Sequence, residues 1–193
     1  MPFNRNIHLP ILFLLTLMTT ACSKSQLHYE LDPEIGDFPE AMSNFKIVAL
    51  KITDNTKPSS NSLNSNQIRI SPKDNQLAQI QNKLMRKLKE MNYKIISNPL
   101  LADVAIDIKF HEVELMLEKS LLKGKFTGNT HLELTISRKS KVWSKIFKAT
   151  KTQEVAYPAD STDATGIINQ LISEQLTKGF SDTGLEKFLL QEF

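Results

Sequence analysis

The chain has 193 residues, of which 40% are hydrophobic and 23% are charged, and its formal net charge is +3. This length and apolar fraction suit one globular domain with a leader, and nothing in the composition requires two domains. Cys22 is the only cysteine, which excludes a disulfide within the chain, so packing alone must stabilise the fold.

The first residues follow the order of a secretory signal. Arg5 lies in a short polar start, an apolar core covers residues 9–18, and small residues lead to Cys22. This core is about half of the roughly 20 apolar residues that a membrane-spanning helix needs. We therefore expect residues 1–21 to be a cleaved signal peptide, and the alternative is a buried N-terminal helix of a cytosolic domain.

The end of this signal resembles a lipobox, in which a small residue precedes a cysteine that receives diacylglycerol. Ala21 and Thr20 fit the pattern, whereas Thr19 stands where Leu is usual. The resemblance implies that Cys22 becomes an acylated N-terminus, with palmitate-type chains holding a periplasmic domain to the membrane. By the same resemblance, Ser23 is compatible with the outer membrane and disfavours retention at the inner membrane.

Residues 22–44 combine acidic side chains with Pro33 and Pro39, which predicts an extended acidic tether after the lipidated cysteine. Its apolar residues indicate that part of it packs on the domain, which we assign to residues 45–193. Residues 45–53 are apolar on both parities, as in a central strand covered on each face. Residues 54–67 predict an exposed loop, and residues 68–70 a brief strand.

A first helix is predicted from Ser71, which is placed at the N-cap with Pro72 in the first turn. Its apolar stripe consists of Leu77, Ile80, Leu84, Leu88 and Met91. Asn92 tolerates the left-handed conformation that ends a helix, and residues 93–97 then predict a short strand.

Three long strands are predicted next. Residues 102–117 alternate between apolar and polar side chains. The apolar side chains change from even to odd positions near His111 and Glu112, which predicts a β-bulge. Residues 126–137 alternate again, with Phe126, Leu132, Leu134 and Ile136 directed inward. A polar turn over residues 138–141 leads to a strand over 142–155, so an antiparallel meander is expected.

A second helix is capped by Asp160 or Ser161 and ends near Gly179, and a short last helix starts near Thr183. The predicted fold is α+β. It has a mainly antiparallel, twisted sheet of about four or five strands, two main helices packed on one face and a short C-terminal helix.

This order of elements, from the lipobox cysteine and acidic leader to the meander and the C-terminal helix pair, is similar to the YajG family of bacterial lipoproteins. The resemblance covers most of the mature chain and involves no catalytic signature, so it implies a location and a fold more than a task. The same order is similar to small α+β domains of envelope lipoproteins that serve transport or assembly machines, a likeness of fold that does not transmit function.

No motif for catalysis, metal or cofactor binding emerges. His28, His111 and His131 have no second ligand at metal spacing. The letters His111-Glu112-Val113-Glu114 lack the second histidine of a metalloprotease helix and are better explained as the polar edge of a sheet. We expect no enzyme, no metal and no cofactor. A hydrolase would need His111 or His131 to approach a Ser and an Asp.

The main functional signal is charge. Residues 119–151 contain nine basic residues and the single acid Glu133. The candidate surface for an anionic partner consists of Lys123, Lys125, Arg138, Lys139 and Lys141. Such a surface fits an acidic envelope protein or anionic lipid headgroups, while export would remove nucleic acid from reach. The alternative is a solvated meander whose lysines protect sheet edges.

From these features we expect a lipid-anchored component of the envelope that binds or scaffolds without catalysis. The competing hypothesis is an accessory subunit of lipid or lipopolysaccharide transport that holds an acyl chain between sheet and helices.

Overall fold

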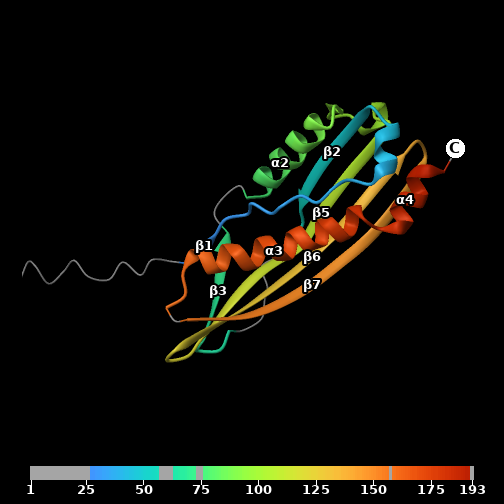
Figure 1. Cartoon of the computed structure of the whole chain (residues 1–193). Helices are drawn as coiled ribbons and strands as arrows, with labels where there is room; N and C mark the ends of the chain where they lie inside the picture. Colours follow the sequence, from blue (N-terminus) through green and yellow to red (C-terminus); the bar gives the residue numbers. More distant parts are fainter. Residues whose placement is uncertain (1–26, 57–62, 73–75, 157, 192–193) are drawn as a thin grey trace, which may run out of the picture.

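A long mixed sheet runs diagonally through the molecule, and all helices lie on one of its faces (Figure 1). The computed structural model describes residues 27–56, 63–72, 76–156 and 158–191. The predicted signal peptide and Cys22 lie outside the described residues.

The sheet contains seven strands in the described part of the chain. They are β1 (His28–Tyr29), β2 (Ile47–Asp54), β3 (Gln67–Pro72), β4 (Lys94–Ile96), β5 (Val104–Lys119), β6 (Lys123–Arg138) and β7 (Lys141–Ala156). The helices are α2 (Gln76–Glu90), α3 (Ser161–Phe180) and α4 (Thr183–Leu190), with short 3-10 helices η2 (Glu40–Asn44) and η3 (Pro99–Leu101).

The long strand β5 organises the sheet. One of its edges pairs along its length with β6, and β6 pairs with β7, so the predicted antiparallel meander is confirmed. Its other edge is shared: β2 pairs in parallel with the first half and β3 pairs antiparallel with the second half. The remaining short strands extend this edge, β4 beside β2 and β1 beside β3, both in parallel.

The predicted sheet was wrong in strand number and in direction. The α+β class holds, but seven strands replace four or five, and three of the pairings are parallel. Strands β3 and β4 were expected over residues 68–70 and 93–97, whereas β1 was not, because its two residues are too few for a clear alternation in sequence. The parallel pairing of β4 with β2 arises because α2 lies on the crossover that returns the chain beside β2.

The start of the first helix was also misplaced. Ser71 and Pro72 end strand β3, where they pair with His28 and Tyr29, and α2 begins at Gln76. Residues 73–75, which include the expected first-turn Asp74, lie outside the described residues. Pairing with a leader strand 43 residues earlier is a non-local contact, and it overrides the local capping signal.

The predicted β-bulge is confirmed. The β5–β6 register shifts between Phe110 and Glu112, which leaves His111 as the extra residue. Val104, Ile106, Ile108 and Phe110 are buried before the shift, and Leu115 and Leu117 are buried after it. The bulge therefore keeps one apolar face on the helices along the whole strand.

The end of α2 follows the predicted signal. Asn92 has φ 65°, in the left-handed region. The Tyr93 amide donates to the Leu88 carbonyl (3.1 Å) and the Asn92 amide to the Lys89 carbonyl (2.9 Å). This pair of bonds is a Schellman motif, and buried Leu88 and Tyr93 supply its usual apolar contact.

The core lies between the sheet and the helices. The predicted stripe of α2 is buried at Ile80, Leu84 and Leu88, while Met91 is 41% exposed beyond the helix end. Each fully buried Leu or Ile contributes roughly 1.5–3 kcal/mol. The predicted inward residues of β6 are all at most 1% exposed. Asp160 caps α3 as predicted, accepting from the amides of Thr162 and Asp163.

The structure describes residues 27–44 of the predicted tether, which we call the leader. These residues pack extensively on the domain. Tyr29, Leu31 and Pro33 are buried at alternating positions, and Phe38 and Met42 continue into the core. In Figure 1 this segment lies between α2 and α3, over the same face of the sheet. It fills the space that the two helices leave between them.

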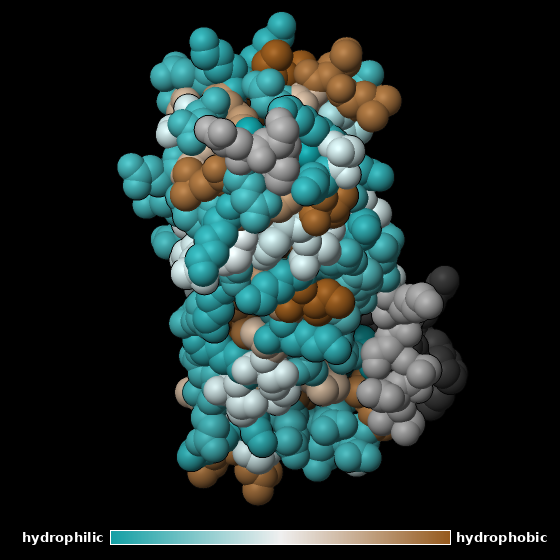
Figure 2. Space-filling model, turned by 90° about the vertical axis from the view of Figure 1, so that its right-hand side faces the viewer, coloured by the Kyte–Doolittle hydropathy of each residue, from teal (hydrophilic) through white to brown (hydrophobic). Residues whose placement is uncertain are grey.

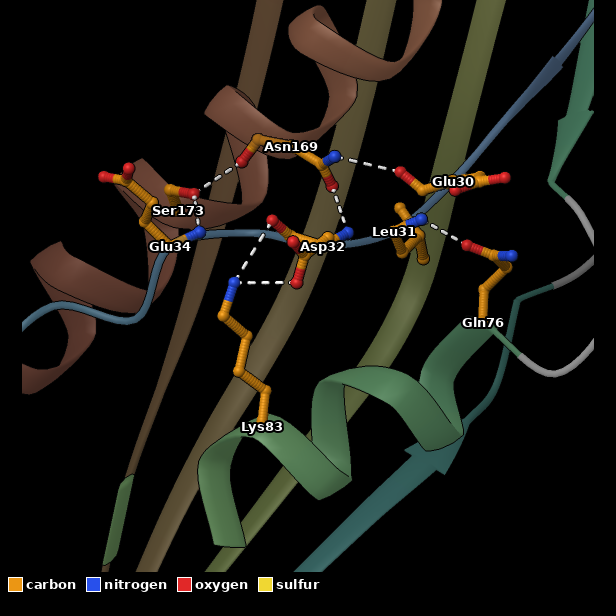
Figure 3. A network of polar contacts seen from close by, with 8 residues as sticks. All are labelled: Glu30, Leu31, Asp32, Glu34, Gln76, Lys83, Asn169 and Ser173. Carbon is orange, nitrogen blue, oxygen red and sulfur yellow. Dashed lines mark hydrogen bonds and ion pairs between the residues drawn. The ribbon is translucent and has the colours of Figure 1, made fainter. Parts of the chain in front are cut away.

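Side chains of α3 hold one edge of the leader (Figure 3). Alternate leader amides donate to α3 residues spaced four apart. The pairs are Glu30 with Thr165 (3.1 Å), Asp32 with Asn169 (2.8 Å) and Glu34 with Ser173 (2.8 Å). Two strand residues rise about 6.6 Å and four helix residues about 6 Å, so the repeats match over this length.

Helix α2 holds the other edge of the leader (Figure 3). Buried Gln76 accepts a hydrogen bond from the Leu31 amide. Lys83 forms an ion pair with Asp32 (2.7 Å), and Lys87 donates to the carbonyls of Ile35 and Gly36, both at 2.7 Å. The leader backbone is thus bonded to a helix on each side, as the middle strand of a sheet is bonded to its neighbours.

No helix in the described ranges combines the length and the apolar character needed to cross a membrane.

Replacing Asn169 by Ala should destabilise the protein by about 1–3 kcal/mol. Asn169 accepts from the Asp32 amide and donates to the Glu30 carbonyl (2.9 Å), so the substitution removes two bonds to the leader. Urea unfolding measures the loss. The matched control is Gln170→Ala on the exposed side of α3, where only a bond to Glu174 is lost, with an expected change within about 0.5 kcal/mol. Equal effects of the two variants would contradict the role of the leader contacts.

Candidate functional site on the open face of the sheet

The face of β5, β6 and β7 opposite the helices carries the molecule's most organised polar side chains outside the leader. Strands direct successive side chains to opposite faces, and alternate residues of β6 are fully buried against the helices. The outward set on β6 is Lys125, Thr127, Asn129, His131, Glu133, Thr135 and Ser137. We call this surface the open face.

Glu133 is the centre of the open face and contacts all three strands. Its Oε2 lies 3.1 Å from His111 Nε2. Its Oε1 accepts from the hydroxyls of Ser144 (3.2 Å) and Thr135 (3.4 Å), with Lys109 Nζ at 3.8 Å. The hydrogen bond from His111 is the main cause that lowers the pKa of Glu133, and burial opposes it. The carboxylate is therefore held in its charged form.

The bulge brings His111 to this carboxylate. Phe110 pairs with Leu132 on the inner face and Glu112 pairs with His131 on the open face, so the extra residue between them is His111. Its side chain is 30% exposed and reaches Glu133, two residues along β6 from His131. The sequence indicated the bulge but suggested a polar sheet edge. The structure places His111 on the interior strand β5, between the residues that pair with β2, which end at Phe110, and those that pair with β3, which begin at Leu115.

His131 adds a second imidazole to the cluster. Its ring lies on that of His111, with centroids 4.8 Å apart and planes inclined by 39°. Its Nε2 is buried and has no hydrogen-bond partner in the structure. Burial is the main cause that lowers the pKa of His131, followed by the charge of Lys148 and by His111. His131 is therefore held neutral over more of the pH range than an ordinary histidine.

In this geometry His111 and Ser144 do not form a nucleophile–base pair. Ser144 and His111 both bind Glu133, on its two different oxygens, so the histidine contacts the carboxylate and not the hydroxyl. A nucleophilic serine needs a base within hydrogen-bond reach of its oxygen and a third group that orients this base. Within the described residues, no three His, Cys, Asp or Glu side chains are grouped so that they could hold a metal ion.

The five basic residues of the predicted anionic-partner surface fall into two groups. Arg138, Lys139 and Lys141 surround the β6–β7 turn, whereas Lys123 and Lys125 begin β6. The 16 residues of β6 separate these groups by about 50 Å at the usual rise of a strand. The structure therefore does not bring the five residues onto one surface.

The group at the β6–β7 turn is partly structural. Arg138 donates to the carbonyls of Leu189 (3.0 Å) and Gln191 (2.5 Å), and its guanidinium lies 4.9 Å from the centroid of the Phe45 ring. It thereby ties the end of α4 to the sheet. Lys139 has φ 51°, as at the first central position of a type II′ hairpin turn.

The group at the other end of β6 is close to acidic residues. Lys123 forms an ion pair with Glu154 (2.8 Å), and the hydrogen bond in this pair is the main cause that raises the pKa of Lys123. A surface hollow of about 260 Å³ lies here. Its lining consists of Glu118, Lys119, Ser120, Lys123, Gly124, Lys125 and Glu154. The charges around this hollow are therefore mixed.

Sequence reasoning identified Glu133 as the only acid in a basic stretch but did not recognise its role. Its partners Lys109, His111 and Ser144 come from neighbouring strands, up to 24 residues away in sequence. Two features of the sequence could have indicated these partners: the bulge near His111 and the turn at residues 138–141. Together they fix the register that places these side chains opposite one another.

The lowered pKa of His131 predicts a pH dependence of stability. The unfolded chain, with a pKa near 6.5, binds a proton more readily than the folded protein. The free energy of unfolding should therefore fall as the pH decreases below about 6.5. We expect His131→Gln to make this decrease smaller between about pH 7 and pH 5, as measured by urea unfolding at each pH.

The control is Glu133→Gln. Because the pKa of Glu133 is already below its ordinary value of 4.5, its contribution is lost only at a lower pH. Glu133→Gln should therefore keep the decrease between about pH 7 and pH 5. If His131→Gln retained the full wild-type decrease, His131 would not be its origin.

Comparison with solved structures finds several that are similar to this chain. Protein XCC0632 from Xanthomonas campestris has a TM-score of 0.50 at 9% sequence identity, and the match covers 83% of this chain and 95% of that one. A protein described as a neuraminyllactose-binding hemagglutinin homologue from Helicobacter pylori has a TM-score of 0.45 at 13% identity, with 84% and 97% covered. Lipoprotein GNA1162 from Neisseria meningitidis has a TM-score of 0.34 at 7% identity, with 69% and 99% covered.

Comparison with curated proteins gives no match. Comparison with protein families gives one match, which covers more than half of the chain. Residues 53–190, from the end of β2 to the end of α4, match the family described as "Uncharacterized lipoprotein". The chain therefore belongs to this family of uncharacterised lipoproteins.

Proposed function

We propose that the protein is exported, loses residues 1–21 and is held at the membrane by lipid on Cys22. The lipoprotein family supports this proposal, together with the apolar segment and small residues that precede the only cysteine. Ser23 favours the outer membrane, facing the periplasm, over the inner membrane. The narrower likeness to the YajG family belongs to the same proposal.

In this location the protein acts as a non-catalytic binding or scaffolding component. The open face is the observation that carries this role. Its polar side chains are held by a network around Glu133, and Val142 (62% exposed) and Ile146 (54% exposed) lie beside Ser144 on β7. A fixed polar surface with a few exposed apolar side chains suits contact with a protein partner.

The alternative, an acyl ligand held between sheet and helices, has less support because that interface is filled. A Cβ added to Gly128 would lie 2.6 Å from Leu171 Cδ1, and one added to Gly179 would lie 3.0 Å from Leu134 Cδ2. The leader occupies the space between α2 and α3. An acyl chain would have to displace these side chains or the leader.

The two basic groups suggest different partners within this proposal. The β6–β7 turn, which carries Lys139 and Lys141, lies at the upper right end of the molecule in Figure 1, where an acidic envelope protein could reach it. The start of β6, which carries Lys123 and Lys125, lies at the lower left end, on the side from which the described chain starts, where anionic headgroups are nearer. Neither nucleic acid nor a cofactor has a role in this proposal.

The anchor is tested by Cys22→Ala in a host that processes lipoproteins. We expect the wild type to incorporate labelled palmitate and to sediment with membranes, because its acyl chains partition into the bilayer. The variant should lose the label and should no longer depend on lipid for attachment. Ser23→Asp is the matched control, which should keep the label and shift the protein to the inner membrane. Unchanged labelling and sedimentation of Cys22→Ala would contradict the anchor.

The binding surface is tested with a photo-crosslinking amino acid at Ile146 in intact cells. We expect a discrete crosslinked product from this position, because Ile146 is exposed on the open face. The control position is Glu174, which is exposed on the outer side of α3. Mass spectrometry of the product identifies the partner. Equal products from both positions, or none from Ile146, would contradict a specific role of the open face.

A further inference from the structure

The turn between β5 and β6 displays two leucines. Leu121 is 96% exposed and Leu122 is 82% exposed. The turn is closed beneath them: the Ser120 amide and hydroxyl both donate to the Lys123 carbonyl, at 2.9 and 2.8 Å. The Lys123 amide donates in return to Ser120 Oγ (3.2 Å). These bonds fix the backbone so that both side chains project beyond the end of the sheet.

This turn lies at the same end of the molecule as the start of the described chain (Figure 1). The strand register shows the relation in detail. His28 pairs with Ser71, so Leu27 is level with Ile70, and Ile70 pairs with Leu115. From Leu115, strand β5 continues to Lys119 and then into the turn. Figure 2 shows hydrophobic side chains projecting at the lower end of the molecule, where Figure 1 places this turn.

The covalent reach of the anchor matches the distance to the turn. Leu27 lies five residues after Cys22, and these five steps span at most about 18 Å when fully extended. Leu121 lies six residues after Leu115, and six steps span roughly 20 Å at the rise of a strand. With the sheet upright on the membrane, a lipid-bearing Cys22 cannot hold the turn clear of the bilayer surface. The turn meets the surface unless the domain tilts.

The surroundings favour an apolar contact over a purely electrostatic one. The turn is flanked by Lys119, Lys123 and Lys125, but also by Glu118 and Glu154. Lys123 is paired with Glu154. The five formal charges therefore nearly cancel, and the exposed leucine side chains are the feature that a membrane interface would stabilise.

We propose that Leu121 and Leu122 enter the interfacial layer of the membrane to which Cys22 is anchored, forming a second contact that orients the domain. This inference rests on the lipid anchor of the proposed function. Two contacts, one covalent and one apolar, set which way the sheet stands. The open face then projects sideways from the membrane surface, and Lys139 and Lys141 lie far from it.

The test uses the full-length lipidated protein in vesicles of phosphatidylethanolamine and phosphatidylglycerol. The only tryptophan is removed by Trp143→Phe, and Leu121→Trp places a fluorescent probe in the turn. Lipids brominated near the top of the acyl chains should quench its emission by about half or more, since apolar side chains in the interface reach this depth. The matched control is Leu100→Trp in η3, 90% exposed at the opposite end, where no quenching is expected.

The outcomes separate this inference from the anchor. Vesicle flotation without quenching at position 121 overturns the inference and leaves the anchor intact. A blue-shifted but unquenched emission also overturns it, because the turn is then buried against protein, such as a second copy. Quenching abolished by high salt overturns the apolar contact, since it shows an electrostatic one. Failure of the protein with intact Cys22 to float overturns the anchor and this inference together.

Discussion

The fold depends on the match between the two-residue repeat of the leader and the four-residue repeat of α3. Because these repeats are nearly equal, three successive outward amides find acceptors on one helix, while the intervening Leu31 amide bonds to α2. The leader contains only two residues of regular strand. Its backbone is nevertheless hydrogen-bonded on both sides, as the backbone of a central strand is. Its apolar side chains complete the core between the sheet and the helices.

Local sequence signals predicted the elements that local forces determine. The left-handed Asn92, the Asp160 cap and the bulge at His111 each depend on a few neighbouring residues. The same reasoning failed at Ser71, which bonds within a strand because the leader pairs with it. The parallel pairings of β2 with β4 and β5 were equally hidden. Each needs a partner far away in the chain, and hydrophobic periodicity does not report such partners.

The candidate site shows the same contrast: composition revealed which charged residues are present, but the strand register decides which of them meet. The basic stretch was visible in the sequence, but strand β6 holds its two basic groups, residues 123–125 and 138–141, at opposite ends of the molecule. Conversely, Glu133, the single acid in this stretch, has four hydrogen-bonding or charged partners in the structure, which composition could not indicate. Charge along a meander therefore predicts surface potential poorly until the pairing of its strands is known.

The edge formed by β7 carries a further consequence. This strand has 16 residues and, in the described chain, only β6 as a hydrogen-bonded neighbour. Lys148 lies on the open face and Lys151 on the helix side, so an approaching strand would meet a cation on either side of the ribbon. Burying either lysine against a second strand would cost its hydration, so these cations disfavour edge-to-edge pairing of β7 with another chain.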